Sequence, residues 1–372
     1  MRFRDSETQK LLRDTARAYL RDKYPWKRLY ALERGDSRFG EADLKAFAEM
    51  GWLGLPAPES RGGGGLTLLE AAVVVDECGY AAVPAPIAAG NVAADLISTS
   101  SSREADQHLA DLAAGRRLYT VSEATRRRGR AAAGDSPAPL SLAGGRLSGV
   151  LPLIPFGEQA DLALAPVAVE GAPAFAVVPL EAARREPVQM LDRQGYCNLQ
   201  FEDVDAAALL VLARDGEAEA LHERCDALNT AFSLIELAGL MQRVLEMTGE
   251  YISNRVQFGQ PIAKFQAARH HAADLLMQAE TSRWTAYHAL WSFQTNADSR
   301  EIWLAKHWAI RAAKSAFEIT HLLHGGIGVG LEYPLHLYTQ AMAAFAVRNG
   351  TLNEMVTRTL ESIDLRAAPA GR

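Results

Sequence analysis

The sequence has few of the features that mark several large classes of protein. It contains only 3 cysteines in 372 residues, Cys78, Cys197 and Cys225, whose odd number and wide spacing exclude a disulfide framework and a zinc cluster. No apolar run approaches the ~20 residues that span a bilayer, and the N-terminus lacks the apolar core of a secretory signal. We therefore expect a cytoplasmic protein with no membrane insertion. No G-x-G-x-x-G follows a strand-like segment, which argues against a Rossmann dinucleotide fold.

The charge balance gives no sign of a nucleic-acid partner. The formal net charge is −6, and the basic run within 126–130 is local, so it is interpreted as a solvated loop. Apolar residues make up 48% and charged residues 23%, which is typical of a soluble globular enzyme. The length allows two or three domains with a large buried core.

The pattern changes twice along the chain. Apolar residues spaced three and four apart predict helices between residues 6 and 115, and short runs rich in Val, Leu and Phe predict strands, for example 162–169, 175–178 and 199–201. Long helical patterns then return. They cover 226–254, 264–295, 300–323, 335–347 and 351–363. The fold class is therefore α+β, with an N-terminal helical domain (1–117), a small middle β domain (118–216) and a C-terminal helical bundle (217–372).

A chemically distinctive turn lies between the first two bundle helices. Gly259 and Pro261 break the helical pattern, which leaves Arg255 at one helix end and brings Phe258 and Gln266 near the same turn. A guanidinium suits a pyrophosphate, an aromatic face suits a planar ring, and a carboxamide can bond to the edge of a heterocycle. Together they can grip a dinucleotide. The alternative is a plain helix hairpin with a capping arginine and a buried phenylalanine.

A glycine-rich segment, His324-Gly325-Gly326-Ile327-Gly328-Val329-Gly330, follows the next two helices. Backbone without Cβ atoms can pass close to a ligand, and its amides can face phosphate oxygens. His321 and His324 lie three residues apart, with no cysteine or carboxylate at ligand spacing, so we expect capping and packing roles for them and no metal.

These segments carry a resemblance to a known family. R-x-Q-F-G-x-P-I-x-x-F-Q, followed by H-G-G-x-G and then Glu332-Tyr333-Pro334, resembles the acyl-CoA dehydrogenases, particularly their bacterial branch for bulky or steroid-like acyl groups. The segment G-W-L-G-L at 51–55, with Pro58-Glu59, extends the resemblance over nearly the whole chain.

The resemblance implies an α+β acyl-CoA dehydrogenase-like fold with a C-terminal four-helix bundle and FAD bound at a subunit interface. It implies a homo-oligomer or a heterotetramer with a related dehydrogenase chain. It also implies α,β-dehydrogenation of an acyl-CoA, with electrons leaving through an electron-transfer flavoprotein. The positions that it assigns to FAD contacts are Ser122, Arg255, Gln257, Phe258, Gln266, His324, Gly325, Gly326, Gly328 and Thr351.

The catalytic base of the family is missing from its usual places. Its commonest position corresponds to Asn349 and a minority position to Asn229, and an amide cannot accept the proton. Other carboxylates on the same helix include Asp226, one turn before Asn229, and Glu236, seven residues after it on the same face. Glu236 is the preferred candidate base. The alternative is that Glu236 is a helix carboxylate paired with a neighbouring cation.

The middle domain also departs from the family pattern. The T-E-P-x-x-G-S-D segment is reduced to Ser122 and residues 123–125, W-I-T corresponds to 153–155 and ends in Pro155, and Leu322 replaces a glutamine before the glycine pair. Contacts that reach a neighbour's flavin are thus kept better than those that hold the chain's own. The chain is either a homomeric enzyme with a relocated base or a catalytically incomplete subunit that serves a partner chain. A non-redox member of the fold is a further alternative.

Overall fold

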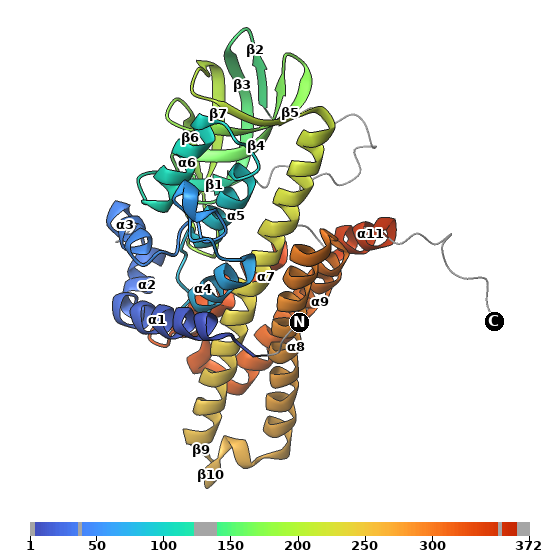
Figure 1. The fold of residues 1–372 in the computed structure, drawn as a ribbon. Helices are drawn as coiled ribbons and strands as arrows, with labels where there is room; N and C mark the ends of the chain where they lie inside the picture. The colour runs from blue at the N-terminus through green and yellow to red at the C-terminus, as the bar shows by residue number, and fades with distance from the viewer. Residues whose placement is uncertain (1–3, 36–38, 123–139, 349–351, 363–372) are drawn as a thin grey trace, which may run out of the picture.

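The computed structural model describes residues 4–35, 39–122, 140–348 and 352–362. Helices come first, then a sheet, then a second set of helices, which confirms the predicted α+β order (Figure 1). The basic run within 126–130, the segment 123–125, and Asn349 and Thr351 lie outside the described residues.

The N-terminal helices begin at recognisable capping residues. Ser6 and Gln9 form a capping box at the start of α1, in which the Ser6 side chain accepts a hydrogen bond from the backbone of Gln9. Thr67 and Glu70 form a capping box at the start of α4. Helices α4 and α5 are apolar on nearly all sides and lie in the core, as such a pattern requires. The elements are α1 (Glu7–Lys23), α2 (Trp26–Glu33), α3 (Glu41–Glu49), η1 (Glu59–Arg61), α4 (Leu68–Tyr80), α5 (Ile87–Ile97) and α6 (Arg103–Ala113).

The middle part is a sheet in the order β6-β7-β3-β2-β4-β5-β8, with β1 paired in parallel to β4. Its central hairpin runs in unbroken register from Leu162↔Pro179 to Val169↔Ala172, as expected for two mostly apolar strands that are buried on both faces. The strands are β1 (Tyr119–Val121), β2 (Leu140–Ala143), β3 (Arg146–Ile154), β4 (Leu162–Val169), β5 (Ala172–Pro179), β6 (Arg184–Val188), β7 (Tyr196–Asp205) and β8 (Leu210–Arg214).

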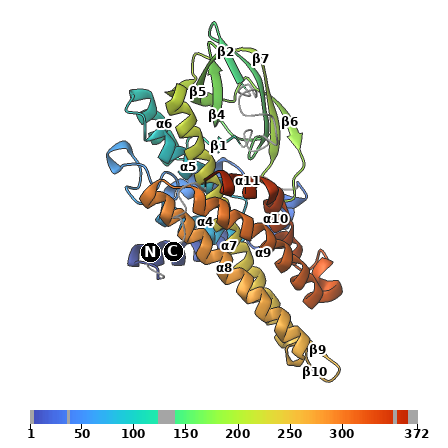
Figure 2. The same ribbon diagram turned by 90° about the vertical axis from the view of Figure 1, so that its right-hand side faces the viewer.

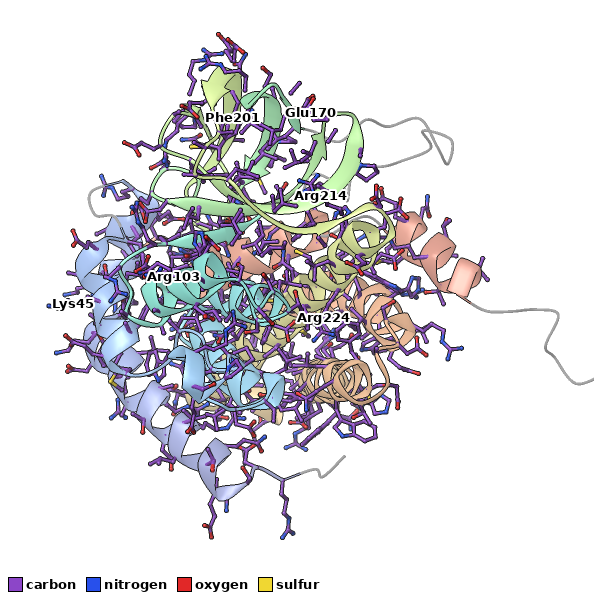
Figure 3. All side chains as sticks on the ribbon, turned by 45° about the horizontal axis from the view of Figure 1, so that its top comes forward. Lys45, Arg103, Glu170, Phe201, Arg214 and Arg224 are labelled. Carbon is purple, nitrogen blue, oxygen red and sulfur yellow. The ribbon has the colours of Figure 1, made fainter. Side chains whose placement is uncertain are left out.

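Helix α7 is the longest element of the described structure and runs from the sheet to the far tip of the molecule (Figures 1 and 2). Its 40 residues, at 1.5 Å each, make it roughly 60 Å long. It starts at Asp215 and not at residue 226 as the sequence pattern predicts. Arg224, labelled in Figure 3, belongs to this additional stretch and forms a two-pronged ion pair with Asp95 of α5, with Nε 2.7 Å from the carboxylate.

The remaining elements complete the helical bundle. They are α7 (Asp215–Asn254), β9 (Val256–Gln257), β10 (Gln260–Pro261), η3 (Ile262–Lys264), α8 (Gln266–Asn296), α9 (Arg300–His324), η4 (Gly325–Val329), α10 (Leu335–Val347) and α11 (Leu352–Ser362). Helices α7 and α8 run side by side to the β9–β10 tip (Figure 2). Among the described residues, no helix combines the length and apolar character needed to cross a bilayer.

Two glycines let α4 and α7 cross in direct backbone contact. A methyl group on Gly239 of α7 would lie 2.0 Å from the carbonyl oxygen of Asp76, and one on Gly79 of α4 would lie 2.0 Å from that of Glu236. Real Cβ atoms are not found that close to backbone oxygens. The crossing therefore requires glycine on both helices, and it fixes the part of α7 that carries Glu236.

Candidate functional site

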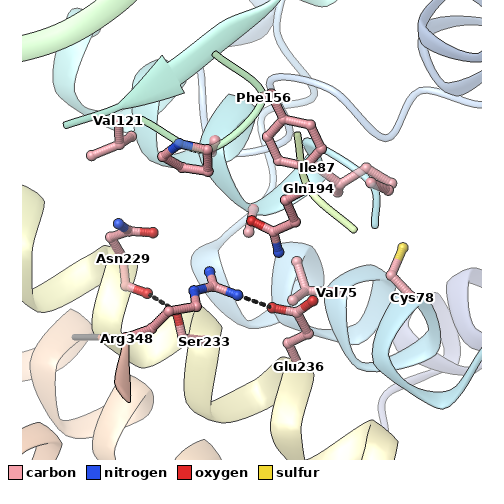
Figure 4. A pocket seen from close by; sticks show the side chains of 14 residues that line it. Val75, Cys78, Ile87, Val121, Phe156, Gln194, Asn229, Ser233, Glu236 and Arg348 are labelled. Carbon is pink, nitrogen blue, oxygen red and sulfur yellow. Dashed lines mark hydrogen bonds and ion pairs between the residues drawn. The ribbon is translucent and has the colours of Figure 1, made fainter. Parts of the chain in front are cut away.

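A small cavity lies where the three parts of the chain meet (Figure 4). Asn229, Ser233 and Glu236 come from one face of α7, since they are four and three residues apart. The other lining residues come from α4, the start of α5, the middle domain and the end of α10. They are Val75, Cys78, Ala85, Ile87, Ala88, Ala89, Val121, Pro155, Phe156, Gln194 and Arg348. The structure thus brings the preferred base candidate and the minority base position to one wall.

Arg348 occupies this cavity with two carboxylates around it. Its Nη1 lies 3.0 Å from Asp192 Oδ2 and 3.7 Å from Glu236 Oε2 (Figure 4 draws the Glu236 pair). The side chains of Arg348 and Asp192 are only 8% and 3% exposed. Asp192 also accepts a 3.1 Å hydrogen bond from the hydroxyl of Tyr196. Glu236 therefore has a cationic neighbour, as expected if it is a helix carboxylate held in an ion pair. Its role as the catalytic base stays a prediction.

The cavity left by this charge cluster measures about 30 Å³. That is room for about one water molecule and not for an acyl chain. Methylene groups placed beside the Arg348 cluster would also have to displace or desolvate charges, which is unfavourable. In the arrangement of the described residues, the cavity is too small for an acyl chain.

Asp226, the other candidate base, points to a different partner. It is 7% exposed, and Arg358 of α11 lies 3.5 Å from its carboxylate. It is not among the residues that line the cavity. Asn349, the commonest base position, follows Arg348 directly but lies outside the described residues, as does Thr351.

Two described middle-domain positions, Ser122 and Pro155, correspond to segments that the resemblance places beside the chain's own flavin. The backbone N–H of Ser122 donates to the carbonyl of Leu164 at 2.9 Å, so it continues the pairing of β1 with β4. Pro155 has no N–H to donate, and its carbonyl accepts a 2.6 Å bond from the hydroxyl of Thr120. At this position the chain therefore offers no hydrogen-bond donor to a cofactor.

The second group of predicted residues lies at the opposite end of α7. Arg255 caps that helix, and Phe258 and Gly259 form the two-residue turn of the β9–β10 hairpin with φ values of 51° and 79°. Two successive positive φ angles are typical of a type I′ turn, which a phenylalanine adopts only at a cost. The Phe258 side chain is 92% exposed, so the structure does not bury it as the plain-hairpin alternative would require. Gln257 and Gln266 are exposed beside it.

The glycine turn lies next to the same end of α7. Gly325 ends α9 with φ 61°, and a methyl group on Gly325 or Gly326 would meet no atom within 4 Å, so a ligand can approach the backbone there. His324 stacks on Tyr251 of α7 with ring centroids 4.5 Å apart. The structure thus brings the hairpin end and the glycine turn together within one chain.

A surface cleft of about 420 Å³ opens at this end of the molecule. It is lined by Arg243, Met247, Glu250, Tyr251, Asn254, Arg255, Tyr333 and Pro334. Arg255 therefore lies in a wall open to solvent that it shares with the half-buried rings of Tyr251 and Tyr333, a setting that suits a phosphate-bearing ligand. The sequence pattern did not point to Tyr251; its position one turn before Arg255 is the signal that could have found it.

The two histidines before the turn serve packing and hydrogen bonding. His321 Nε2 lies 3.1 Å from the hydroxyl of Thr339, and His324 Nδ1 donates to the carbonyl of Thr320 at 3.0 Å. Burial lowers the pKa of both imidazoles below the usual value of 6.5. Within the described residues, no group of three or more histidines, cysteines or carboxylates could hold a metal ion.

The cavity and the hairpin are too far apart to act on one ligand within one chain. Arg255 follows Glu236 by 19 residues of continuous helix, which is roughly 28 Å at 1.5 Å per residue. Figure 1 shows the hairpin at the end of α7 remote from the sheet. A ligand held by Arg255 is therefore remote from the cavity of the same chain.

Comparison with known proteins identifies the family. Residues 6–116 match the acyl-CoA dehydrogenase N-terminal domain and residues 229–363 match the C-terminal domain. The chain is 30% identical over 323 residues to the acyl-CoA dehydrogenase FadE27 of Mycobacterium tuberculosis, covering 82% of this chain and 84% of that one. It is 29% identical over 291 residues to FadE28 of the same organism, covering 77% and 82%.

Two solved structures share the whole fold. One is the ChsE4-ChsE5 complex of Mycobacterium tuberculosis, with a TM-score of 0.87, 24% identity and 100% of each chain covered. The other is a variant of the Tcur3481-Tcur3483 steroid ACAD, with a TM-score of 0.83, 27% identity and coverage of 96% and 97%. The chain therefore belongs to the acyl-CoA dehydrogenase family, whose members are FAD-dependent oxidoreductases.

Among the described residues, those that fit FAD best lie at the hairpin and the glycine turn. The hairpin and glycine turn offer a guanidinium, an exposed aromatic ring and open glycine backbone, which suit its diphosphate and planar ring. At the chain's own cavity, Pro155 has no N–H to donate to a cofactor. The ion pairs of Arg348 with Asp192 and Glu236 occupy the space that a ligand would need. The described residues at the hairpin and the glycine turn therefore suit FAD better than those around the cavity.

Proposed function

We propose that this chain takes part in the FAD-dependent α,β-dehydrogenation of an acyl-CoA thioester as one subunit of a heteromeric acyl-CoA dehydrogenase. In this role it supplies cross-interface cofactor contacts, and a related chain supplies the base and the acyl site. The observation that carries the proposal is the Arg348 cluster, which fills the chain's own cavity while the contacts at the other end of α7 are intact.

The side chains at the base positions support this division of labour. Asn229 lines the cavity but cannot take a proton, and Asn349 is likewise an amide. Glu236 is the remaining carboxylate of the cavity wall, and it faces the Arg348 guanidinium at 3.7 Å. A carboxylate held in an ion pair is a weaker proton acceptor than a free one.

The chain's own residues would act by binding and orientation. FAD, when bound, supplies the hydride acceptor of the reaction. Arg255 would hold its diphosphate by charge-assisted hydrogen bonds, Phe258 and Gln266 would contact its ring systems, and the backbone amides of Gly325 and Gly326 would be available to its phosphates. Each of these contacts would position the cofactor, and none would transfer a proton. The chain therefore needs a partner chain to supply the catalytic base.

The names of similar structures support both the assembly and the substrate class. One is called a complex of two proteins, and the other, 27% identical, is named as a steroid ACAD formed by two proteins. A bulky or steroid-like acyl-CoA is therefore the proposed substrate, and an electron-transfer flavoprotein the proposed acceptor.

A homomeric enzyme with Glu236 as its base is the second candidate. It is favoured by the place of Glu236 in the cavity wall and by its 23% exposed side chain, which leaves a route for a proton. This mechanism needs Arg348 to leave the cavity before an acyl group enters.

Co-expression distinguishes these functions. The chain is purified alone and after co-expression with a related acyl-CoA dehydrogenase chain chosen as the candidate partner, and bound FAD and its bleaching by acyl-CoA are measured. The heteromer proposal expects a colourless chain alone and a yellow complex that acyl-CoA bleaches. A chain that is yellow alone and bleached by acyl-CoA supports the homomeric enzyme. A yellow complex that no acyl-CoA bleaches favours a non-redox role.

A further inference from the structure

Three aromatic rings meet where α7 ends and the glycine turn begins. Tyr251 lies nearly parallel to His324, with centroids 4.5 Å apart and an interplanar angle of 18°. Tyr333, which follows the turn, has its centroid 5.3 Å from that of His324 and 6.4 Å from that of Tyr251. All three separations fall in or near the range in which aromatic rings attract one another.

The rings join the two parts of the proposed cofactor surface. Tyr251 lies one helical turn before Arg255, and its carbonyl accepts the N–H of Arg255 at 2.8 Å. His324 directly precedes Gly325, the first residue of the turn. A ring pair therefore connects the helix end that carries the guanidinium to the backbone that carries the glycines.

The inner side of the turn is fixed, whereas its outer side is open. His324 is 3% exposed, and its Nδ1–H is used by the carbonyl of Thr320. A methyl group on Gly328 would lie 3.0 Å from the Cβ of His324, so this glycine packs closely on the histidine. Gly325 and Gly326 face empty space.

We propose that Tyr251, His324 and Tyr333 form a ring clamp that holds the glycine turn in place relative to Arg255 and so preorganises the surface that takes the diphosphate of a neighbour's FAD. The three residues are proposed as positioning residues, since their rings contact one another and His324 packs on Gly328 of the turn. The identity of the ligand rests on the proposed function. A turn that is already ordered loses less conformational freedom on binding, and affinity rises accordingly.

The test compares Tyr251→Leu, which removes the ring, with Tyr251→Phe, which keeps the ring and removes the hydroxyl. Hydrogen exchange of the backbone amides of 325–330 is measured in the full chain, and FAD dissociation is measured in the assembly as purified. We expect Tyr251→Leu to speed exchange in the turn and to weaken FAD binding, each by roughly 2- to 10-fold, the effect of losing one aromatic pair. Tyr251→Phe should restore both to near the wild-type values.

Each other outcome rejects a specific part of the argument. Unchanged exchange in the turn, or exchange that rises equally in the β4–β5 hairpin, overturns the clamp. Faster exchange in the turn with unchanged FAD binding also overturns it, provided that Arg255→Ala releases FAD. If neither Tyr251→Leu nor Arg255→Ala affects FAD binding, the proposed function itself fails, and the clamp loses its role with it.

Discussion

The crossing of α4 and α7 gives the sharpest prediction about stability. Gly239→Ala would place a methyl carbon 2.0 Å from the carbonyl oxygen of Asp76 and 2.6 Å from the amide nitrogen of Tyr80. Both neighbours are backbone atoms of a buried helix, so no side-chain rotation can relieve the contact, and the helices must move apart by about 1 Å or more. Overpacking of this kind costs ~1–3 kcal/mol and occasionally more. We expect a loss of roughly 3 kcal/mol for this variant, at the upper end of that range.

Gly249→Ala is the matched control on the same helix. A methyl group there meets nothing within 4 Å, so the variant should gain the ~0.5–1 kcal/mol that alanine contributes over glycine inside a helix. Denaturant unfolding of both variants, followed by circular dichroism at one fixed chain concentration, measures the difference, since assembly adds to apparent stability. A Gly239→Ala chain as stable as the Gly249→Ala chain would refute the close crossing.

Two further predictions concern single side chains. Because burial lowers the pKa of His324 below 6.5, the unfolded chain binds a proton that the folded chain does not, so stability should fall as pH drops below about 6.5 and be fully present above it. His324→Asn should flatten this slope in unfolding measurements at several pH values, and an unchanged slope would contradict the assignment. Glu236→Gln should leave the turnover of the co-expressed complex within about tenfold, whereas loss of a general base lowers the rate by ~10²–10⁴. A loss of that size in steady-state assays would make Glu236 the base.

The sequence pattern predicted those elements whose bounds depend mainly on their own residues. The apolar run 162–169 is β4 to the residue, and 335–347 is α10, because each carries its own periodicity and ends at turn residues. Helix α7 begins 11 residues before the predicted start at 226, because its first three turns are mostly polar and are held in part by the pair of Arg224 with Asp95. Contacts between parts distant in sequence fixed that boundary.

The site shows the same division. The hairpin and the glycine turn are contiguous motifs, so both could be identified in the sequence, and the structure brings the end of α7 and the turn together; their contacts with a cofactor stay a prediction. The partner of Glu236 is Arg348, which is more than a hundred residues away and belongs to no spacing pattern. Its position directly before Asn349 was the only hint. Likewise, Gly79 and Gly239 each look unfavourable for a helix when only the sequence is considered. The close crossing of α4 and α7 explains why glycine is needed at both positions.

The most direct test of the cross-subunit contact is FAD retention by an assembly in which only this chain carries Arg255→Ala. Flavin absorbance per mole of complex is compared with that of wild type, after gel filtration has established that the variant complex is intact. Loss of FAD from a complex whose partner chains are unaltered is the predicted result, because the guanidinium reaches the cofactor from across the interface. Retention of FAD at the wild-type ratio and affinity would contradict the account.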